Sequence, residues 1–471
     1  MWCSYCLILT SCRETAFFRK INQEKIDMQS AENINKCDVL VIGGGPAGSA
    51  ISTKLAQMGR DVVMLEKEQH PRFHIGESLL PMNIPIFEEL GVLEQVEEIG
   101  IRKYGAEFND ENYQNWATYY FGNALDSSIP YAYEVKREDL DTVLFRNAEK
   151  NGVKTFEKTQ ATSIQFNDDH SSLVECVDEN GKTIKWHSRF VVDASGRSTF
   201  LARKFNIKKR SKKHNSAAIF GHFENVVRRE GLDEGNISLA WFEHGWFWMI
   251  PFKDGGMSVG AVCWPHYLNS RKTDVEQFLW DTIALCPPVA NRMKEAKLTT
   301  PVTATGNFTY AASHMAGNGY LMVGDAFAFL DPVFSSGVLL GMAGGLKGAK
   351  VVNTILDNPE KAEQLLKEHE KEIRMALKTF AWFIFRITQP AMRYLFMVRN
   401  ERRIKREKGV TSLLAGDLFR GMPIGRHLLI FKFYYYALFI LGFRDNLRSL
   451  RKRKFDLRGE PTKAKEANYK L

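Results

Sequence analysis

Apolar positions along the chain fall into three patterns. Short apolar runs end in small or acidic residues within residues 37–67, 189–203 and 320–345, which predicts strands that lead into turns. Between about residues 205 and 300 apolar and polar residues partly alternate, which predicts an antiparallel sheet. Residues 359–385 begin with proline, carry early acidic residues and then show helical spacing. Together the patterns predict an α/β protein with a helical C-terminal region.

The same patterns divide the chain into parts. We expect residues 1–35 to be a disordered extension, and Met28 is an alternative start, which leaves open whether residues 1–27 belong to the native protein. Residues 36–358 are predicted to form a nucleotide-binding domain that carries the antiparallel substrate sheet as an insertion at about 205–300. Residues 359–471 are predicted to form the helical region.

Composition narrows the class of protein. The 471 residues are 44% hydrophobic and 25% charged, as in globular proteins. The net charge of +9 is concentrated in residues 401–408 and 448–458, so we predict no nucleic-acid partner. Seven scattered cysteines, with one isolated C-x-x-C at Cys3 and Cys6, favour free thiols in a reducing cytoplasm and no metal site.

An apolar and tyrosine-rich segment at residues 427–443 is short for a membrane-spanning helix and carries Lys432 in its interior. Two interpretations stay open. The segment packs as a helix on the body of the protein, or it lies on an anionic membrane surface with its basic neighbours. The protein is accordingly expected in the cytoplasm, free or membrane-associated.

A complete βαβ nucleotide-binding pattern follows the first apolar run. The glycines of G-x-G-x-x-G give a tight turn, a close backbone approach to a pyrophosphate and close packing of helix on strand. An acidic residue after the second strand predicts a ribose contact, and favours FAD or NAD over NADP. The cofactor-binding residues predicted here are Gly43, Gly45, Ala47, Gly48 and Glu66.

The strands near residues 189–203 and 320–325 extend this reading. With the "GDAF" sequence at residues 324–327, the chain resembles FAD-dependent monooxygenases and their relatives, and the cofactor is then expected to be FAD in a Rossmann-type domain. The resemblance implies that Asp325 binds the ribitol chain and that Arg137 lies near the cofactor.

Three further motifs resemble the flavin-dependent halogenases. They are "PRFHIGESLLP" at residues 71–81, "RKYGAEF" at 102–108 and "GWFWMIPF" at 245–252, and the match runs from about residue 38 to 350. In that family reduced FAD and oxygen oxidise chloride or bromide, and the hypohalous acid passes through a tunnel to a lysine beside the substrate. The resemblance assigns that catalytic role to Lys103; a surface lysine is the alternative.

The resemblance also implies roles for the tryptophan pair and the segment after Asp325. Trp246 and Trp248 would face one side of a strand and separate flavin from substrate, with ordinary core packing as the alternative. The backbone of Ser336 and Gly337 would bind halide beside the flavin, and Ser335 would connect this site to the lysine.

The residue at position 334, a phenylalanine, indicates which class of substrate to expect. It occupies the position where tryptophan halogenases carry a glutamate, so the resemblance is to the branch that acts on phenols and pyrroles, often tethered to a carrier protein. A separate flavin reductase is expected to supply reduced FAD, since no second nucleotide fold is visible. The open alternatives are a geranylgeranyl-reductase-like flavin reductase, a flavin hydroxylase, and a flavin-binding partner without catalysis.

Overall fold

A mixed sheet forms the nucleotide-binding half of the protein. The structure, a computed structural model, describes residues 34–109, 115–211, 214–306, 309–397, 403–420 and 424–457. The central strands run in the order β19-β20-β10-β1-β2-β7, and β8 and β9 extend the sheet from β10. Their bounds are β1 Ile34–Ile42, β2 Val62–Leu65, β7 Lys154–Phe156, β8 Gln160–Phe166, β9 Ser172–Val177, β10 Thr183–Asp193, β19 Ala316–Gly317 and β20 Tyr320–Met322.

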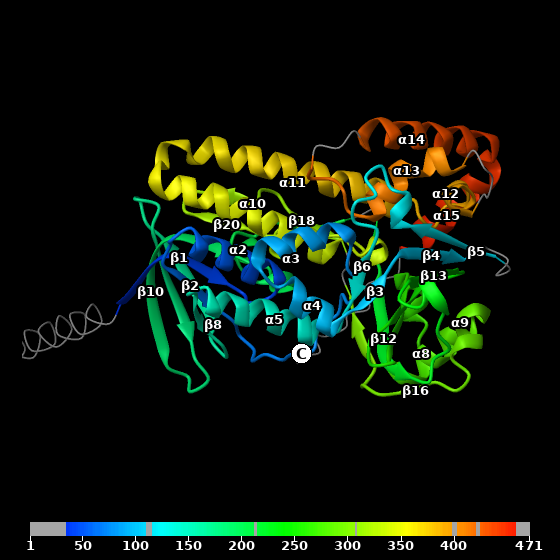
Figure 1. The fold of residues 1–471 in the computed structure, drawn as a ribbon, viewed down its shortest axis with the longest axis horizontal. Coiled ribbons are helices and arrows are strands. Elements are labelled where there is room, and N and C mark those ends of the chain that lie inside the picture. Colours follow the sequence, from blue (N-terminus) through cyan, green and yellow to red (C-terminus); the bar gives the residue numbers. More distant parts are fainter. Residues whose placement is uncertain are drawn as a thin grey trace, which may run out of the picture.

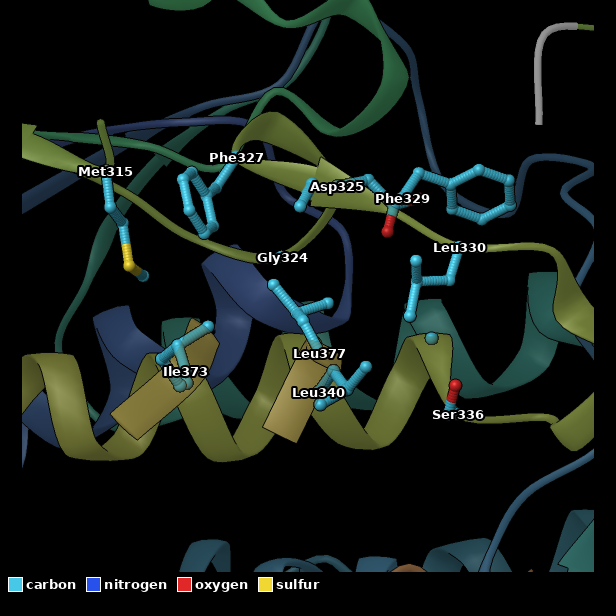
Figure 2. A pocket seen from close by; sticks show the side chains of 13 residues that line it. Met315, Gly324, Asp325, Phe327, Phe329, Leu330, Ser336, Leu340, Ile373 and Leu377 are labelled. Atoms are coloured by element: carbon cyan, nitrogen blue, oxygen red, sulfur yellow. The ribbon is translucent and has the colours of Figure 1, made fainter. Parts of the chain in front are cut away.

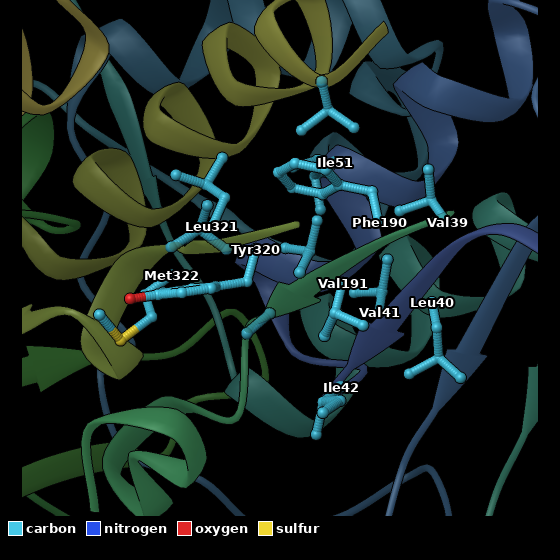
Figure 3. Close-up of a cluster of buried hydrophobic side chains, with 14 of the residues drawn as sticks. Val39, Leu40, Val41, Ile42, Ile51, Phe190, Val191, Tyr320, Leu321 and Met322 are labelled. Atoms are coloured by element: carbon cyan, nitrogen blue, oxygen red, sulfur yellow. The ribbon is translucent and has the colours of Figure 1, made fainter. Parts of the chain in front are cut away.

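The three strands predicted from the apolar runs are neighbours in this sheet. β1 pairs in parallel with both β2 and β10, and β10 pairs in parallel with β20. Val39 and Phe190 lie on the face of the sheet towards Ile51 of helix α2 (Pro46–Gln57), whereas Leu40 and Val191 lie on the opposite face, in a buried core (Figure 3). Because the carboxyl ends of parallel strands share one edge, the loops after β1, β10 and β20 converge there.

Helix α10 (Gly337–Asp357) packs directly on α2. A Cβ added to Gly345 would lie 3.0 Å from the carbonyl oxygen of Ala47, and one added to Gly348 would lie 2.9 Å from Leu321. The small residues in this part of the chain therefore allow two helices to approach closely. The remaining helices of this half are α3 (Ile84–Leu90), α4 (Leu93–Ile99), α5 (Arg137–Lys150) and α6 (Phe200–Lys204).

A second sheet stands beside the first (Figure 1). Its order is β16-β12-β15-β14-β13-β4-β5, with β17 paired to β12, and all pairs except parallel β4–β13 are antiparallel. The strands are β4 Gly105–Asn109, β5 Trp116–Tyr120, β12 Ala217–Glu224, β13 Ile237–Phe242, β14 Gly245–Pro251, β15 Met257–Cys263, β16 Lys297–Leu298 and β17 Thr303–Thr305. The antiparallel sheet predicted for residues 205–300 is present, and it also recruits β4 and β5 from earlier in the chain.

Short elements complete this half of the protein. Helices α7 (Pro265–Asn269), α8 (Val275–Ala284) and α9 (Pro287–Arg292) follow β15. A two-stranded sheet pairs β3 (Ile101–Lys103) with β6 (Ala132–Glu134). A three-stranded sheet contains β11 (Lys208–Arg210), β18 (Tyr310–Ala312) and β21 (Ala328–Phe329).

The C-terminal helices cover the second sheet. They are α11 (Ala362–Ile384), α12 (Pro390–Met397), α13 (Arg403–Leu414), α14 (Ile424–Leu441) and α15 (Phe443–Asp456). In Figure 1, α11 runs beside α10, whereas α12 to α15 gather over β4 and β5 with α14 outermost. The helix predicted at residues 359–385 is confirmed, although its first residues, Pro359–Lys361, form a 3-10 turn. The predicted extension falls, up to residue 33, outside the described residues.

We expect Gly48→Ala to destabilise the protein by about 1–3 kcal/mol, since overpacking costs this much. The added Cβ would lie 1.9 Å from the carbonyl oxygen of Gly43, an oxygen that cannot rotate away. Chemical denaturation of the FAD-free protein measures the effect. Gly425→Ala is the control, because its Cβ would meet nothing within 4 Å. Equal stability of the two variants would contradict the close packing.

Candidate active site

The loop after β1 has the geometry of a phosphate-binding turn. Gly43 has φ +107°, in the region that favours glycine, and α2 starts at Pro46, just after Gly45. The backbone N–H of Gly44 donates to Oε2 of Glu66 at 2.8 Å, so the acidic residue predicted to contact a ribose lies against the loop. Ala47 is in the first turn of α2, where the backbone N–H groups favour an anion.

Arg72 is a residue of this loop region that the sequence analysis did not single out. Its guanidinium lies 3.7 Å from Glu66 and 3.3 Å from Asp141, and Nη2 would be 3.5 Å from a Cβ on Gly45. Among the described residues its Nε and Nη1 make no hydrogen bond, although both are buried. Nη2 lies beside the loop, where a guanidinium suits a phosphate or a ribose oxygen, whereas Nε and Nη1 face Glu68 and Asp141.

Arg137 is buried at the start of α5, behind the "GES" segment. It donates two hydrogen bonds to Asp141, at 2.8 and 3.1 Å, and one to the carbonyl oxygen of Ile75 at 2.8 Å. Asp141 and Glu77 outweigh the cost of burial, and Asp325 adds to their effect, so the pKa of Arg137 is raised. The guanidinium is therefore a fixed positive charge within electrostatic reach of Asp325.

Asp325 lies in a 3-10 turn directly after β20 and lines a cavity with Ser336 and Gly337 (Figure 2). We call this space the Asp325 cavity; Figure 2 shows Asp325 on one side of it and Ser336, at the start of α10, on the other. Desolvation raises the pKa of Asp325 to about 6, against the opposing effects of Arg197 and Arg137. A carboxylate held in this way gains from a bound hydroxyl that donates to it.

Lys103 is buried at the end of β3, with an exposed fraction of 1%, so the alternative of a surface lysine is wrong. Its Nζ donates to Oγ of Ser78 at 2.6 Å and to the carbonyl oxygen of Leu79 at 3.1 Å. It lines a second, apolar cavity, the Lys103 cavity, whose walls are Leu80, Lys103, Ala106, Phe108, Phe121, Ile237, Leu239, Val333, Phe334, Ser335 and Leu414.

Glu134 is the carboxylate partner of Lys103 and was not anticipated from the sequence. Its Oε1 lies 3.5 Å from Nζ of Lys103 and accepts from Oγ of Ser78 at 3.2 Å. Its buried Oε2 has no hydrogen-bond partner in the described parts of the chain. Burial raises the pKa of Glu134 to about 8 and lowers that of Lys103, so desolvation pushes both groups towards their neutral forms.

The segment 334–337 separates the two cavities. Phe334 and Ser335 line the Lys103 cavity, whereas Ser336 and Gly337 line the Asp325 cavity. Ser335 has φ +53°, an unusual conformation for serine, and its Oγ donates to Oγ of Ser78 at 2.9 Å, which in turn contacts Lys103. Consecutive residues thus face different chambers, and α10 begins at Gly337.

The residues that lead into this segment form a separate turn and not the first turn of α10. Pro332–Phe334 form a 3-10 turn, because Asp331 accepts from the N–H of Val333 and the chain then turns at Ser335. Asp331 also accepts from Nε2 of His214 at 2.8 Å, and His214 contacts Arg453 of α15. The sequence carries no local signal for this contact, because its three residues lie more than 100 positions apart.

Trp246 and Trp248 lie on one face of β14, as predicted from their alternation. Both belong to the core cluster that contains Phe108, whereas Phe247 and Met249 pack in the cluster on the opposite face. The Nε1 of Trp248 donates to Ser258 at 3.1 Å. Neither indole is among the residues that line the two described cavities, so a separating role for the pair stays a prediction.

Comparisons with known proteins agree with this arrangement. The family model for an FAD binding domain matches residues 36–376. A flavin-dependent halogenase, armH5, from Armillaria mellea is 32% identical over 83% of this chain and 77% of its own length. The chain belongs to the flavin-dependent halogenase family. The motifs at residues 71–81, 102–108 and 245–252 were therefore correctly recognised.

Other halogenase relatives differ in substrate and in length. A tryptophan 2-halogenase from Chondromyces crocatus is 33% identical, and the match covers 68% of this chain but only 61% of the relative. A 1H-pyrrole-2-carbonyl-[peptidyl-carrier protein] chlorinase from Pseudomonas fluorescens is 26% identical over 82% of this chain and 90% of the relative. The chain thus spans less than two thirds of one relative and nearly all of another.

Two solved structures share the fold of this halogenase family member. A flavoprotein/dehydrogenase from Cytophaga hutchinsonii has a TM-score of 0.78 and 28% identity, covering 86% of this chain and 99% of its own. The myxobacterial chondrochloren halogenase CndH has a TM-score of 0.72 and 31% identity, with 83% and 92% covered. Both structures therefore match the fold of this chain over most of its length.

FAD fits the residues that surround the nucleotide loop. The loop admits no Cβ at Gly43 or Gly48, Nη2 of Arg72 lies beside it, and Asp325 is held at the end of a neighbouring strand. The loop and Arg72 are complementary to a pyrophosphate, and Asp325 is complementary to polyol hydroxyls. The cofactor of this family member is FAD.

We expect Asp325→Asn to stabilise the FAD-free protein above pH 6 by at most about 3 kcal/mol. The pKa of Asp325 is raised from 3.8 to about 6, so the folded protein binds more protons than the unfolded chain between these values. Stability from this group is therefore lost as the pH rises through that window. Denaturation from pH 4 to 8 measures it, with the exposed Asp281→Asn as control.

Asp325→Asn should at the same time weaken FAD binding about tenfold, since a charged acceptor is worth about 1.4 kcal/mol more than a neutral one. Titration of the FAD-free protein with FAD, followed by flavin fluorescence, measures this affinity. A variant that is neither more stable nor weaker in FAD binding would contradict the role of Asp325.

Proposed function

We propose that the chain catalyses halogenation of a phenolic or pyrrolic ring with reduced FAD, oxygen and chloride or bromide. The observation that carries this proposal is the segment 334–337, whose consecutive residues face a cofactor-side cavity and a cavity with a buried lysine. A small oxidant made in the first chamber would pass this segment to reach the second. An organic substrate in the other chamber is kept from the cofactor by the same residues.

The chemistry requires a two-electron oxidation of halide. When bound, reduced FAD (FADH2) would supply the two electrons and two protons with which O2, a halide ion and one further proton give hypohalous acid and water, leaving oxidised FAD. The backbone at Ser336 and Gly337, at the N-terminus of α10, favours the halide through the partial positive charge of the helix end. Asp325 would bind the polyol chain of the cofactor and Arg72 its phosphates, and together they would orient it.

Lys103 is proposed to deliver the halogen. A neutral amine can form an N–halogen bond with hypohalous acid and release water, whereas an ammonium can donate a hydrogen bond to its oxygen; both remain open. Hydrogen bonds to Ser78 and to the carbonyl oxygen of Leu79 fix Nζ at the cavity wall in either case. A fixed carrier confines the oxidant to a ring bound nearby.

Glu134 is proposed as a positioning residue that acts through Lys103. It does not line the Lys103 cavity, but its Oε1 contacts both Nζ of Lys103 and Oγ of Ser78. With its pKa near 8, Glu134 can hold or release a proton close to neutral pH. It can therefore accept the proton that the Lys103 ammonium must lose to become a neutral amine, before that amine captures the halogen and releases water.

The lining of the Lys103 cavity supports an electron-rich ring as substrate. Lys103 and Ser335 are the polar side chains in its described wall, and aromatic and aliphatic side chains form the rest. Phe334 stacks on Phe396 at a centroid distance of 6.4 Å and offers no carboxylate to a substrate N–H. We therefore propose a phenol or pyrrole rather than tryptophan.

Two partners belong to this proposal. A separate flavin reductase is proposed to supply reduced FAD, as anticipated from the single nucleotide fold. A carrier protein is proposed to present the ring, since the related chlorinase acts on a pyrrole held by a peptidyl carrier protein. Another relative is a tryptophan 2-halogenase, so the relatives differ in their substrates. The choice of ring is therefore argued from the residues of the Lys103 cavity.

We expect Lys103→Met to lower halogenation at least about a hundredfold while oxidation of reduced flavin continues, because only delivery to the ring is lost. The assay contains a flavin reductase, NADH, bromide and phenolic or pyrrolic acceptors, offered free and carrier-tethered. Arg102→Met, on the exposed side of the same strand, is the matched control and should retain activity.

The same assay separates the rival functions. Hydroxylated product that forms without halide would indicate a flavin hydroxylase, and reduction of an isoprenoid double bond without oxygen would indicate a reductase. Oxidation of flavin with no altered acceptor in any reaction would favour a binding partner without catalysis. Each of these results would overturn the proposed halogenase.

Glu134→Gln should lower the halogenation rate about tenfold to a hundredfold and remove an ionisation near pH 8 from the pH profile of kcat. Glutamine keeps the shape of the side chain but cannot take a proton. The wild-type rate should rise as the pH passes 8, because Glu134 loses its proton there. A variant whose rate falls equally at every pH would indicate a merely structural carboxylate.

A further inference from the structure

The outward face of α14 is the most strongly apolar exposed surface of the described chain. Of the 16 large hydrophobic side chains that are exposed among the described residues, 10 belong to α14 and α15. Phe433 is 70% exposed, Ile440 70% and Leu441 82%. Scattered single exposures are normal in proteins, but a contiguous group marks a binding surface.

Helix α14 is apolar on two opposite faces. Leu428, Phe431 and Tyr435 are buried against the body of the protein. Leu429, Phe433 and Ile440 point the other way, at spacings of four and seven residues, which align side chains along one face of a helix. The body of the protein therefore covers only one of the two apolar faces of α14.

Exposed basic side chains precede and follow the apolar residues of α14 along the chain. Arg426 is exposed before them on α14, and Arg444, Arg448 and Arg451 are exposed on the following helix. From Ile424 to Asp456 the chain has eight lysines and arginines and two aspartates, and one of these, Asp456, is buried. A surface that combines large apolar side chains with this excess of positive charge is complementary to negative charge at the edge of a hydrocarbon phase.

We propose that α14 and α15 dock the protein on an anionic lipid bilayer, with α14 lying in the plane of the interface. The 18 residues of α14 would, by length and composition, suffice to cross a bilayer, but its inner face is packed on the protein, which favours lying over crossing. Tyr434 and Tyr436 add amphipathic rings, which are preferred at the level of the headgroups.

A bilayer fits this surface better than a second protein does. α14 is the outermost helix on its side of the molecule in the view of Figure 1. Its exposed residues between Leu429 and Leu441 are large and apolar, whereas interfaces between proteins that associate reversibly are only about 56–58% non-polar. Lipid accommodates an outlying apolar helix without a complementary shape.

The docking face is connected to the Lys103 cavity by packed aromatic rings. Phe334 of the cavity wall stacks with Phe396 of α12, and Phe396 contacts Phe431 on the inner face of α14, in each case at 6.4 Å between centroids. One layer of rings therefore separates the proposed membrane contact from the chamber for the ring substrate. The docking itself does not depend on the proposed halogenation.

Sedimentation of the full chain with vesicles tests this inference. We expect the protein to bind vesicles of phosphatidylcholine with one third phosphatidylglycerol, to bind phosphatidylcholine alone at least about tenfold more weakly, and to dissociate as salt rises. Phe433→Ser, Ile440→Ser and Leu441→Ser in one variant should weaken binding at least about a hundredfold, because each apolar side chain that leaves the lipid is worth about tenfold.

The control removes three apolar groups elsewhere that are 50–59% exposed, with Val227→Ser, Leu232→Ser and Leu285→Ser. It should bind anionic vesicles like the unaltered protein, and circular dichroism should show both variants folded. Equal loss in both variants, or no binding to anionic vesicles, would overturn the proposal. A dimer in sedimentation velocity that disappears only in the α14 variant would instead assign the face to a second copy.

Discussion

The enclosed amino group of Lys103 is the constraint around which the active site is arranged. Removing a charged lysine from water costs several kcal/mol unless partners compensate, and Ser78, the carbonyl oxygen of Leu79 and Glu134 all face Nζ. These partners come from the segment after the first βαβ unit and from β6. Pairing of β3 with β6 in the short sheet brings Lys103, on β3, close to Glu134, on β6.

The fold was largely predictable because burial leaves a periodic pattern. The apolar runs at β1, β10 and β20 identified the parallel strands, and alternation identified the antiparallel sheet. The recruitment of β4 and β5 was not predictable, since a parallel pairing of β4 with β13 joins residues about 130 positions apart. Composition also gave no indication that Gly345 and Gly348 serve the packing of α10 on α2.

The residues of the site were predictable where they belong to a motif and not where only the fold brings them together. Lys103, Asp325 and Ser335 were found through motifs, and the structure places Ser335 one hydrogen bond from Ser78, which contacts Lys103. Glu134 lies three residues before Arg137 in a strand whose pattern resembles any buried strand. Its importance depends on register with β3, which sequence alone does not specify.

Residues 334–335 line one cavity and residues 336–337 line the other. This arrangement limits how such an enzyme can acquire a new substrate. A backbone change at Ser335 alters both chambers at once, so in the proposed reaction it would perturb oxidation of halide together with recognition of the ring. Leu239 and Leu414 face the Lys103 cavity alone and belong to different elements, β13 and α13. Natural divergence and directed evolution of substrate range are therefore expected to accumulate substitutions at such positions, leaving the four-residue partition intact.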